Sequence, residues 1–321
     1  MCNSNKAAHP TCPTAQTTAN PSAPGAGLVG PEHLSPEHLP MSLVQLLRSL
    51  PPLVVALSGG IDSRFLCYAA QLCGADVLAV HARGPHIPAG ESTWALAWAK
   101  ACGLPVLVVD FDPLPLPHVI NNSRDRCYAC KTGLLAAIGA ALVQAGQKGR
   151  TLCDGSNADD LNAFRPGLRA LKEAEVVSPL ALAGMDKGAI RAAARATGLD
   201  DPEQRARPCL LTRLAYGLEP QKETLARLAA AEEELAALTD VPAAAESISN
   251  IQPCPRPVIK ISVSALGDLR LRLTPEPVLQ VESLPEKHVG KVKEILSRQG
   301  FAGCELRVGQ GVSGFYDRQQ N

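Results

Sequence analysis

Short apolar runs alternate with longer segments of mixed polarity between residues 53 and 198. The apolar runs are rich in Val, Leu and Ala, a composition typical of strands that are buried on both faces. These predicted strands cover 53–57, 76–82, 105–111 and 150–155. The segments between them have the length and composition of helices, predicted over 62–73, 91–103 and 130–146. Strands that alternate with helices predict an α/β fold with a parallel sheet covered on both faces.

Further patterns lie on either side of this region. They predict helices over 42–50, 186–198 and 221–239. From about residue 258 the order becomes β-β-β-α-β, which predicts a smaller α+β domain,. The chain begins with a segment rich in Pro, Ala, Thr, Ser and Asn and poor in aliphatic residues, as is typical of disordered tails,. The predicted organisation is a disordered tail over 1–40, an α/β domain over 41–240, a linker over 241–254 and an α+β domain over 255–321.

The balance of basic and acidic residues limits the kinds of partner molecule that the protein is expected to bind. The chain has 31 basic and 31 acidic residues, and zero formal net charge does not favour binding to nucleic acid or to a membrane surface,. Aromatic residues make up only 3%, so few side chains are available for stacking on single-stranded nucleic acid,. No signal-peptide pattern opens the chain, and the apolar segment 133–146 is too short to span a bilayer,. We therefore predict a cytoplasmic protein with neither a nucleic-acid nor a membrane partner.

The stretch LSGGIDS, residues 57–63, follows the first predicted strand and precedes a helix. Two adjacent glycines suit a tight turn that approaches a ligand closely, and a helix N-terminus attracts phosphate. The stretch lacks the G-x-x-x-x-G-K-[ST] and G-x-G-x-x-G patterns of other phosphate loops. It matches S-G-G-x-D-S and is similar to the PP-loop of ATP pyrophosphatases. Ser58, Gly59, Gly60 and Ser63 are expected to donate hydrogen bonds to phosphate, and Asp62 to help hold Mg²⁺. The alternative is a glycine turn without a ligand.

The cysteines form a second candidate site. Eleven of them, an odd number in a chain without a secretion signal, do not indicate a disulfide framework,. Cys127 and Cys130 form a C-x-x-C pair, whose spacing suits two ligands of one metal centre or a redox pair,. A structural role is the alternative, since no second C-x-x-C follows. A third candidate, Cys209, belongs to a predicted loop with three arginines, Arg205, Arg207 and Arg213.

Five motifs occur in the order typical of one enzyme family. They are SGGIDS, RCYACK, DGSNADD followed by RPGLRAL, SPL followed by DKGAIR, and CLLTRLAYG. On these motifs, the chain resembles the LarE-type ATP-dependent sacrificial sulfur transferases, PP-loop enzymes of nickel-pincer nucleotide biosynthesis, from residue 57 to about 238. The resemblance implies a PP-loop domain of the adenine nucleotide α-hydrolase-like type over 41–240.

The resemblance implies a reaction on a nucleotide similar to nicotinate mononucleotide with two ring carboxylates. ATP adenylates one carboxylate with release of pyrophosphate, a sulfur nucleophile displaces AMP, and a thiocarboxylate results. Family members with only the cysteine equivalent to Cys209 sacrifice its sulfur and retain dehydroalanine. Members that also have the C-x-x-C pair bind a [4Fe-4S] cluster through three thiolates, and the fourth iron carries the sulfide for transfer. Because this chain has all three cysteines, we expect the three-cysteine iron–sulfur subtype.

The resemblance also assigns roles to residues of this sequence. Cys209 and Asp62 are the expected catalytic residues, and Cys127, Cys130 and Cys209 are the expected cluster ligands. The residues expected to bind ATP, Mg²⁺ or the substrate are Ser58, Gly59, Gly60, Asp62, Ser63, Asp154, Ser156, Asn157, Arg165 and Arg213. The expected partners are a small nucleotide substrate, a sulfide or cysteine-desulfurase sulfur source and further copies of the chain in a homo-oligomer.

Several side chains near these motifs have simpler interpretations. In DGSNADD, Ser156 or Asn157 suits a helix cap as well as a ligand contact. Arg165 suits either the substrate phosphate or a surface ion pair. His81 and His86 follow a strand end, where core or surface roles are expected more than a place in an adenine pocket.

The sequence departs from the family pattern at three places. EQRARPC replaces the usual Lys-Pro before Cys209, Arg64 replaces the usual second serine after the PP-loop, and GVSGFYD matches the Gly-Tyr-Arg ending only in part. Three other classes stay open: a PP-loop amide-forming ligase, as in NAD or GMP synthesis, a tRNA thiolase, and a non-enzymatic nucleotide-binding module. A ligase leaves the cysteines unexplained, and a tRNA thiolase is expected to have a basic surface.

Overall fold

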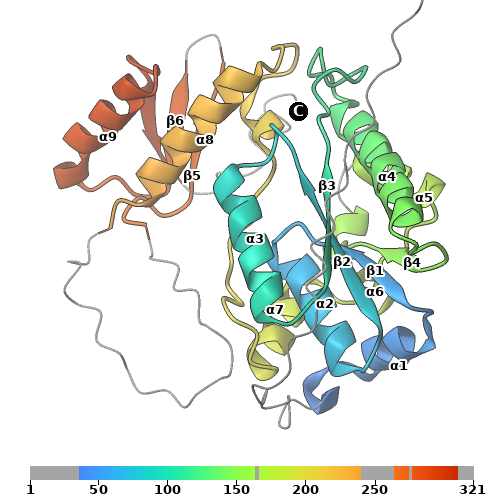
Figure 1. Ribbon diagram of the computed structural model, residues 1–321. Coiled ribbons are helices and arrows are strands. Elements are labelled where there is room, and N and C mark those ends of the chain that lie inside the picture. Colours follow the sequence, from blue (N-terminus) through green and yellow to red (C-terminus); the bar gives the residue numbers. More distant parts are fainter. Residues whose placement is uncertain (1–35, 163–165, 240–263, 275–276, 310–321) are drawn as a thin grey trace, which may run out of the picture.

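The computed structural model describes residues 36–162, 166–239, 264–274 and 277–309, coloured by sequence in Figure 1. Most of the predicted tail, the predicted linker over 241–254 and Arg165 lie outside the described residues. The same is true of most of the first strand predicted in the C-terminal part.

Four parallel strands form the larger sheet, in the order β3-β2-β1-β4. The strands are β1 (Leu53–Ala56), β2 (Val77–Arg83), β3 (Val106–Asp110) and β4 (Thr151–Cys153). Leu53 of β1 is opposite both Val77 of β2 and Thr151 of β4, so β1 is a central strand. The strand order reverses beside β1, and in open parallel sheets ligands bind at such a reversal, beyond the carboxyl ends of the strands. The sheet confirms the predicted α/β architecture and is consistent with a PP-loop domain.

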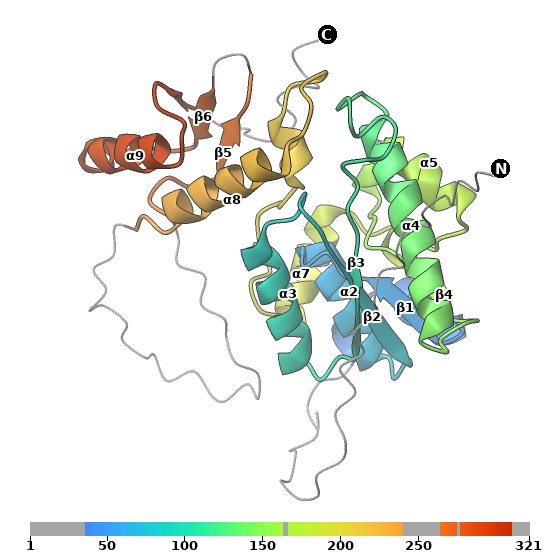
Figure 2. The same cartoon turned by 45° about the horizontal axis from the view of Figure 1, so that its top comes forward.

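Helices cover both faces of this sheet. They are η1 (Pro36–His38), α1 (Met41–Ser49), α2 (Ile61–Leu72), α3 (Ala89–Ala101), α4 (Arg126–Gln144), η2 (Asp159–Asn162), α5 (Pro166–Glu173), α6 (Pro179–Leu182) and α7 (Lys187–Ala196). Figure 2 shows α3 on one side of the strands and α4 on the other. The helices α1, α2, α6 and α7 share a core with α3 on the first face.

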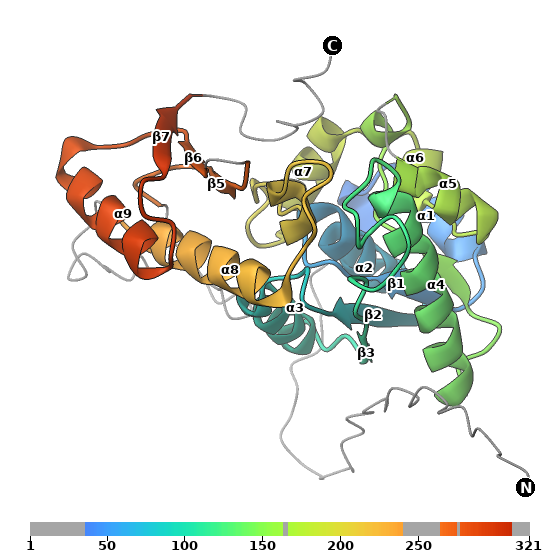
Figure 3. The same cartoon turned by 90° about the horizontal axis from the view of Figure 1, so that it is seen from above.

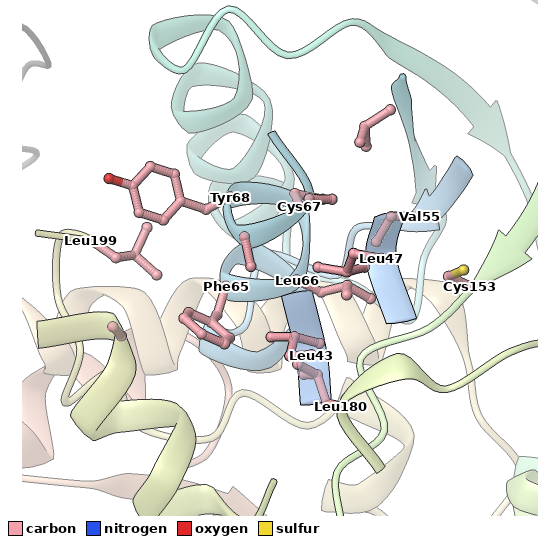
Figure 4. Packing of buried hydrophobic residues seen from close by; sticks show 14 of the residues in the cluster. Leu43, Leu47, Val55, Phe65, Leu66, Cys67, Tyr68, Cys153, Leu180 and Leu199 are labelled. Atoms are coloured by element: carbon pink, nitrogen blue, oxygen red, sulfur yellow. The ribbon is translucent and has the colours of Figure 1, made fainter. Parts of the chain in front are cut away.

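The core on the first face fixes α2, the helix that follows the glycine-rich loop. Leu43 and Leu47, one turn apart on α1, meet Phe65 and Leu66 of α2 and Leu180 of α6 (Figure 4),. Each of these side chains is at most 1% exposed. Full burial of a Leu or Phe side chain contributes about 1.5–3 kcal/mol. The loop at the start of α2 therefore has a firmly packed support.

On the opposite face, Ile138 and Leu142 of α4 pack on Val54 and Leu107 of the sheet. Among the described residues, α4 is the one helix that is long and apolar enough to cross a membrane, judged by its length and composition only. It is longer than the apolar segment recognised in the sequence, and in this structure it lies against the sheet and α5. The cytoplasmic location stays a prediction.

The C-terminal part has a second sheet, shown apart from the larger sheet in Figure 3. Its order is β5-β6-β7, antiparallel between β5 and β6 and parallel between β6 and β7. The elements are η3 (Leu210–Arg213), α8 (Lys222–Ala236), β5 (Leu269–Arg272), β6 (Val278–Val281), α9 (Glu286–Arg298) and β7 (Glu305–Val308). The last four agree with the β-β-α-β part of the predicted β-β-β-α-β order, and most of the first predicted strand lies outside the described residues. Leu225 of α8 and Leu210 of η3 share one core with Leu271, Leu279 and Val292. Apolar contacts thus join residues from both sides of position 240, where the sequence predicts a domain boundary. That boundary stays a prediction.

Candidate active site

A cavity of about 440 Å³ lies beyond the carboxyl ends of β1, β2 and β4. Residues from four segments with predicted site residues are among those lining it. They come from the glycine-rich loop (Ser58, Gly60, Asp62, Ser63), the C-x-x-C segment (Arg126, Cys127, Cys130, Lys131), the segment after β4 (Asp154, Gly155, Ser156, Asp160) and the loop before η3 (Arg207, Cys209). The fold therefore brings most of the residues singled out in the sequence to one place.

The glycine-rich loop turns sharply between β1 and α2. Gly59 has φ +82°, a conformation that favours glycine, and an added Cβ would lie 2.9 Å from the Cβ of Ala95,. Gly60 precedes α2, and no side chain caps the helix start. The first backbone N–H groups of α2 have no partner one turn earlier, and the helix dipole is positive there. This end of α2 suits an anion.

The two serines of the loop hold its shape. The backbone N–H of Ser58 donates to Oγ of Ser63 at 3.2 Å, and that hydroxyl donates to the carbonyl of Gly60 at 3.0 Å. The segment that follows β4 also lies close to the start of α2. An added Cβ at Gly155 would lie 2.8 Å from the backbone nitrogen of Ser63. A glycine is needed at position 155 for this contact.

Asp62 has one paired and one unpaired carboxylate oxygen. Its Oδ2 lies 2.5 Å from Nζ of Lys187, the lysine of the DKGAIR motif. Its Oδ1 is buried and has no hydrogen-bond partner among the described residues. A buried carboxylate oxygen of this kind is a suitable ligand for a hard cation such as Mg²⁺. Lys187 belongs to a motif that was recognised in the sequence. Its contact with Asp62 was not predicted, because that contact depends on how α7 packs on α2.

The segment after β4 is held largely by its own hydrogen bonds. The carboxylate of Asp154 accepts from the hydroxyls of Ser156 at 2.6 Å and Ser178 at 2.7 Å. The side-chain oxygen of Asn157 accepts from the backbone N–H of Asp159 at 3.0 Å, at the start of η2. Asn157 therefore acts as a helix cap, the simpler of its two interpretations, and it is not among the residues lining the cavity. Asp154 and Ser156 do line it.

The three cysteines all line the cavity. Cys127 is exposed, whereas Cys130 and Cys209 are half-buried. Cys127 and Cys130 are three residues apart in the first turn of α4 and so share one face of the helix,. Burial, with the nearby thiols of Cys209 and Cys127, raises the pKa of Cys130 to about 12. No group of three His, Cys, Asp or Glu side chains among the described residues is close enough to hold a single metal ion.

The loop with Cys209 is braced from both parts of the fold. The backbone N–H of Leu210 donates to the carbonyl of His86 at 2.9 Å. From β5, Arg270 donates to the carbonyl of Ala206 at 2.6 Å, and Arg272 to that of Thr212 at 3.0 Å. The C-terminal sheet thus positions the backbone on either side of Cys209.

Arg213 lies behind the loop with Cys209 and is not among the residues lining the cavity. Its guanidinium pairs with Glu232 of α8 at 2.8 Å and donates to the carbonyl of Pro208 at 3.0 Å. Arg165, the other arginine expected to bind a ligand, lies outside the described residues.

Two histidines and a glutamate also line the cavity, namely His81, His86 and Glu91. Burial lowers the pKa of His86 to about 4, with a small opposing effect of Asp112. Burial also lowers the pKa of His81, whose Nδ1 lies 2.8 Å from the carbonyl oxygen of Leu57. Both rings are therefore neutral at pH 7. Core or surface roles were expected for them from the sequence; both are buried, and both lie at the cavity wall.

A comparison with models of protein families finds none that matches the chain. A comparison with known proteins finds relatives. The uncharacterised protein slr1717 of Synechocystis is 32% identical over 192 residues, 60% of this chain and 71% of the relative. The pyridinium-3,5-bisthiocarboxylic acid mononucleotide synthase of Lactiplantibacillus plantarum, a LarE protein, is 32% identical over 199 residues, 61% of this chain and 71% of that enzyme. The chain belongs to the LarE family.

Another relative is the uncharacterised protein MJ0830 of Methanocaldococcus jannaschii, 30% identical over 183 residues, 57% of this chain and 69% of the relative. Membership in the LarE family confirms the resemblance that the five motifs indicated. The three-cysteine iron–sulfur subtype of LarE proteins stays a prediction for this chain.

Proposed function

We propose that this LarE-family chain is an ATP-dependent sulfurtransferase. It adenylates a carboxylate of a pyridinium dicarboxylate mononucleotide and converts it to a thiocarboxylate, with release of pyrophosphate and AMP, in nickel-pincer cofactor biosynthesis. The observation that supports this most is the single cavity lined by both the glycine-rich loop and the three cysteines. The name of the relative from Lactiplantibacillus plantarum supports the substrate class.

In the first step, the glycine-rich loop binds the phosphates of ATP. The free N–H groups at the start of α2 and the hydroxyls of Ser58 and Ser63 donate to phosphate oxygens. Asp62 contributes its unpaired Oδ1 to Mg²⁺, while Lys187 neutralises the other oxygen,. The substrate carboxylate attacks the α-phosphate of ATP, and the bond to pyrophosphate breaks.

In the second step, sulfur replaces AMP. A carboxylate is a poor electrophile, and the adenylate gives its carbon a good leaving group. A C–S bond forms, the C–O bond to AMP breaks, and the electron pair leaves with the AMP phosphate. Neutral His81 and His86 lie at the cavity wall and add no positive charge there.

The three thiols fit the ligand set of a [4Fe-4S] cluster. They line one cavity, and two of them lie near the N-terminus of α4, where the helix dipole is positive,. Burial raises the pKa of Cys130 to about 12, so its thiolate would form as iron binds,. Cys127, Cys130 and Cys209 would each bind one iron as thiolates. The bound cluster would supply a further iron, without a protein ligand, to hold the sulfide that is transferred. The absence of a site for a single metal ion among the described residues does not conflict with a larger group.

The test is anaerobic purification followed by measurement of iron, sulfide and absorption. We expect about four iron atoms per chain, and we expect Cys127→Ala, Cys130→Ala and Cys209→Ala each to lose iron and sulfur transfer but retain ATP binding. The sacrificial alternative predicts an active Cys127→Ala variant and loss of one H₂S from the wild-type mass after a single turnover. Dehydroalanine at position 209 in an active, iron-free protein would exclude the cluster mechanism.

An amide-forming ligase makes a different prediction. It would form an amide in the presence of ammonia and retain that activity in Cys209→Ala.

The proposal also includes the cellular setting of the protein. It places the protein in the cytoplasm as a homo-oligomer, with sulfide or a cysteine desulfurase as the sulfur source and with neither nucleic acid nor a membrane as a partner.

A further inference from the structure

Arg126 is a buried cation in the wall of the candidate active site. It is the first residue of α4, directly before Cys127, and it lines the cavity. Only 6% of the residue is exposed. Its Nε and Nη1 are both buried and have no hydrogen-bond partner among the described residues. A buried donor without an acceptor is costly, and more so when it carries charge.

Three other buried arginines of the described chain each have an acidic partner, although Nε of Arg64 and of Arg270 has no hydrogen-bond partner among the described residues. Arg64 pairs with Asp200, Arg213 with Glu232 and Arg270 with Asp268. No carboxylate pairs with Arg126 in the described part of the chain, although a guanidinium has five donors and is charged at any physiological pH. Its missing partner is therefore expected to be an anion that enters the cavity.

An aromatic ring lies against this guanidinium. The Cζ of Arg126 lies 4.5 Å from the centre of the Tyr216 ring. The turn with Tyr216 is held by Asn122, whose side-chain amide donates to the carbonyl oxygens of Leu214 at 3.2 Å and Ala215 at 2.7 Å. A cation–π contact of this kind does not use the N–H donors of the guanidinium, and their forked arrangement suits a planar or trigonal oxyanion.

The surroundings add to the attraction for anions. Lys131 and Arg207 line the same cavity, and the N-terminus of the 19-residue helix α4 is the positive end of its dipole,. We propose that Arg126 binds a carboxylate or phosphate group of the substrate through the edge of its guanidinium, beside the cysteines and apart from the phosphate loop. The inference rests on the proposed function only for the identity of that substrate.

The test compares Arg126→Gln with Arg124→Gln on the full-length chain, purified anaerobically. Arg124 also lies over the Tyr216 ring, at 5.9 Å, but is exposed and does not line the cavity, so it is a matched control. Calorimetric titrations use pyridine-3,5-dicarboxylate, inorganic phosphate and the neutral pyridine-3,5-dicarboxamide. We expect binding of at least one anion, weakened at least about tenfold in Arg126→Gln and less than about twofold in Arg124→Gln. The anion that loses affinity identifies the group bound.

A second readout separates ligand binding from a structural role. Arg126→Met retains most of the apolar volume but removes the unpaired charge. We expect its Tm without ligand to rise by about 2 °C, and the increase in Tm that the anion produces in the wild type to disappear. A structural role predicts the opposite, a lower Tm. Equal anion affinities in wild type and Arg126→Gln, or no anion binding by the wild type, would overturn the inference. Failure of ATP-dependent pyrophosphate release alone would contradict the proposed function and leave the anion site intact.

Discussion

Gln204 donates a hydrogen bond of 3.1 Å from its side-chain amide to the carbonyl oxygen of Gly59. The bond joins the segment that leads to Cys209 to the glycine-rich loop, two segments far apart in the sequence. The same Gln204 accepts at its Oε1 from Nη2 of Arg64 at 3.2 Å. Through Gln204, Arg64 of α2 is thus connected both to the glycine-rich loop and to the segment that leads to Cys209.

Arg64 is the centre of that connection. It is fully buried, pairs with Asp200 at 3.0 Å, and lies between the Trp94 and Trp98 rings at 4.8 Å and 5.4 Å. Trp98 also donates to Asp200 at 2.8 Å. Loss of Arg64 breaks the ion pair with the half-buried Asp200 and also removes the hydrogen bond to Gln204,. The segment over 200–204 would then lose its attachment to α2.

We expect Arg64→Met to lower the free energy of unfolding by about 3–5 kcal/mol, because it breaks a buried ion pair. The matched control is Arg83→Met, since Arg83 pairs with Asp110 while both side chains are about half exposed. That change should cost less than about 1 kcal/mol. Urea unfolding of both variants is the measurement, and equal midpoints would show that Arg64 does not hold the segment.

The pairing of Asp62 with Lys187 leads to a prediction on catalysis. Asp62→Asn removes the charge that is proposed to hold Mg²⁺, so pyrophosphate release should fall at least about a hundredfold with the fold retained. Lys187→Met should lower it less, because Oδ1 of Asp62 stays available. The control is Asp76→Asn, because Asp76 is an exposed carboxylate that pairs with the partly buried Arg150 and does not line the cavity. Turnover of ATP at the wild-type rate by Asp62→Asn would contradict the PP-loop assignment.

Much of this fold and site is visible in the sequence, since strands, helices and the glycine-rich turn are set by local patterns. The three cysteines were also recognised, through spacing and motif. The sequence did not show the roles of Arg64, Arg126 and Lys187, because each depends on which distant side chain is or is not its neighbour. For the same reason, the sequence did not show that Arg213, which was expected to bind a ligand near Cys209, pairs with Glu232.

His86 predicts a pH dependence of stability. Its pKa is lowered by burial from 6.5 to about 4 in the folded protein, so between these values the unfolded chain binds more protons. Stability from neutral His86 is therefore complete above pH 6.5 and is lost as the pH falls toward 4. Between pH 7.5 and 5 the loss should be about 2 kcal/mol.

The measurement is urea unfolding of the wild type and of His86→Gln at both pH values. Carboxylates also titrate in acid, but they are the same in both proteins, so the difference between the two pH dependences isolates His86. We expect the wild type to lose about 2 kcal/mol more than His86→Gln. Parallel pH dependences would mean that His86 is protonated in the folded protein near its ordinary pKa.

The short distance between the segment that follows β4 and the start of α2 leads to a prediction with a matched control variant. An added Cβ at Gly155 would lie 2.8 Å from the backbone nitrogen of Ser63 and 3.1 Å from its Cα, and backbone atoms are unable to turn aside. Gly155→Ala should therefore push the start of α2 away from β4, lower the free energy of unfolding by about 1–3 kcal/mol and reduce pyrophosphate release. Gly139 is exposed within α4 and has nothing within 4 Å of an added Cβ. Gly139→Ala should instead stabilise the protein by about 0.5–1 kcal/mol and leave pyrophosphate release unchanged. If both alanine variants release pyrophosphate equally well, the position of α2 against β4 does not govern the phosphate loop.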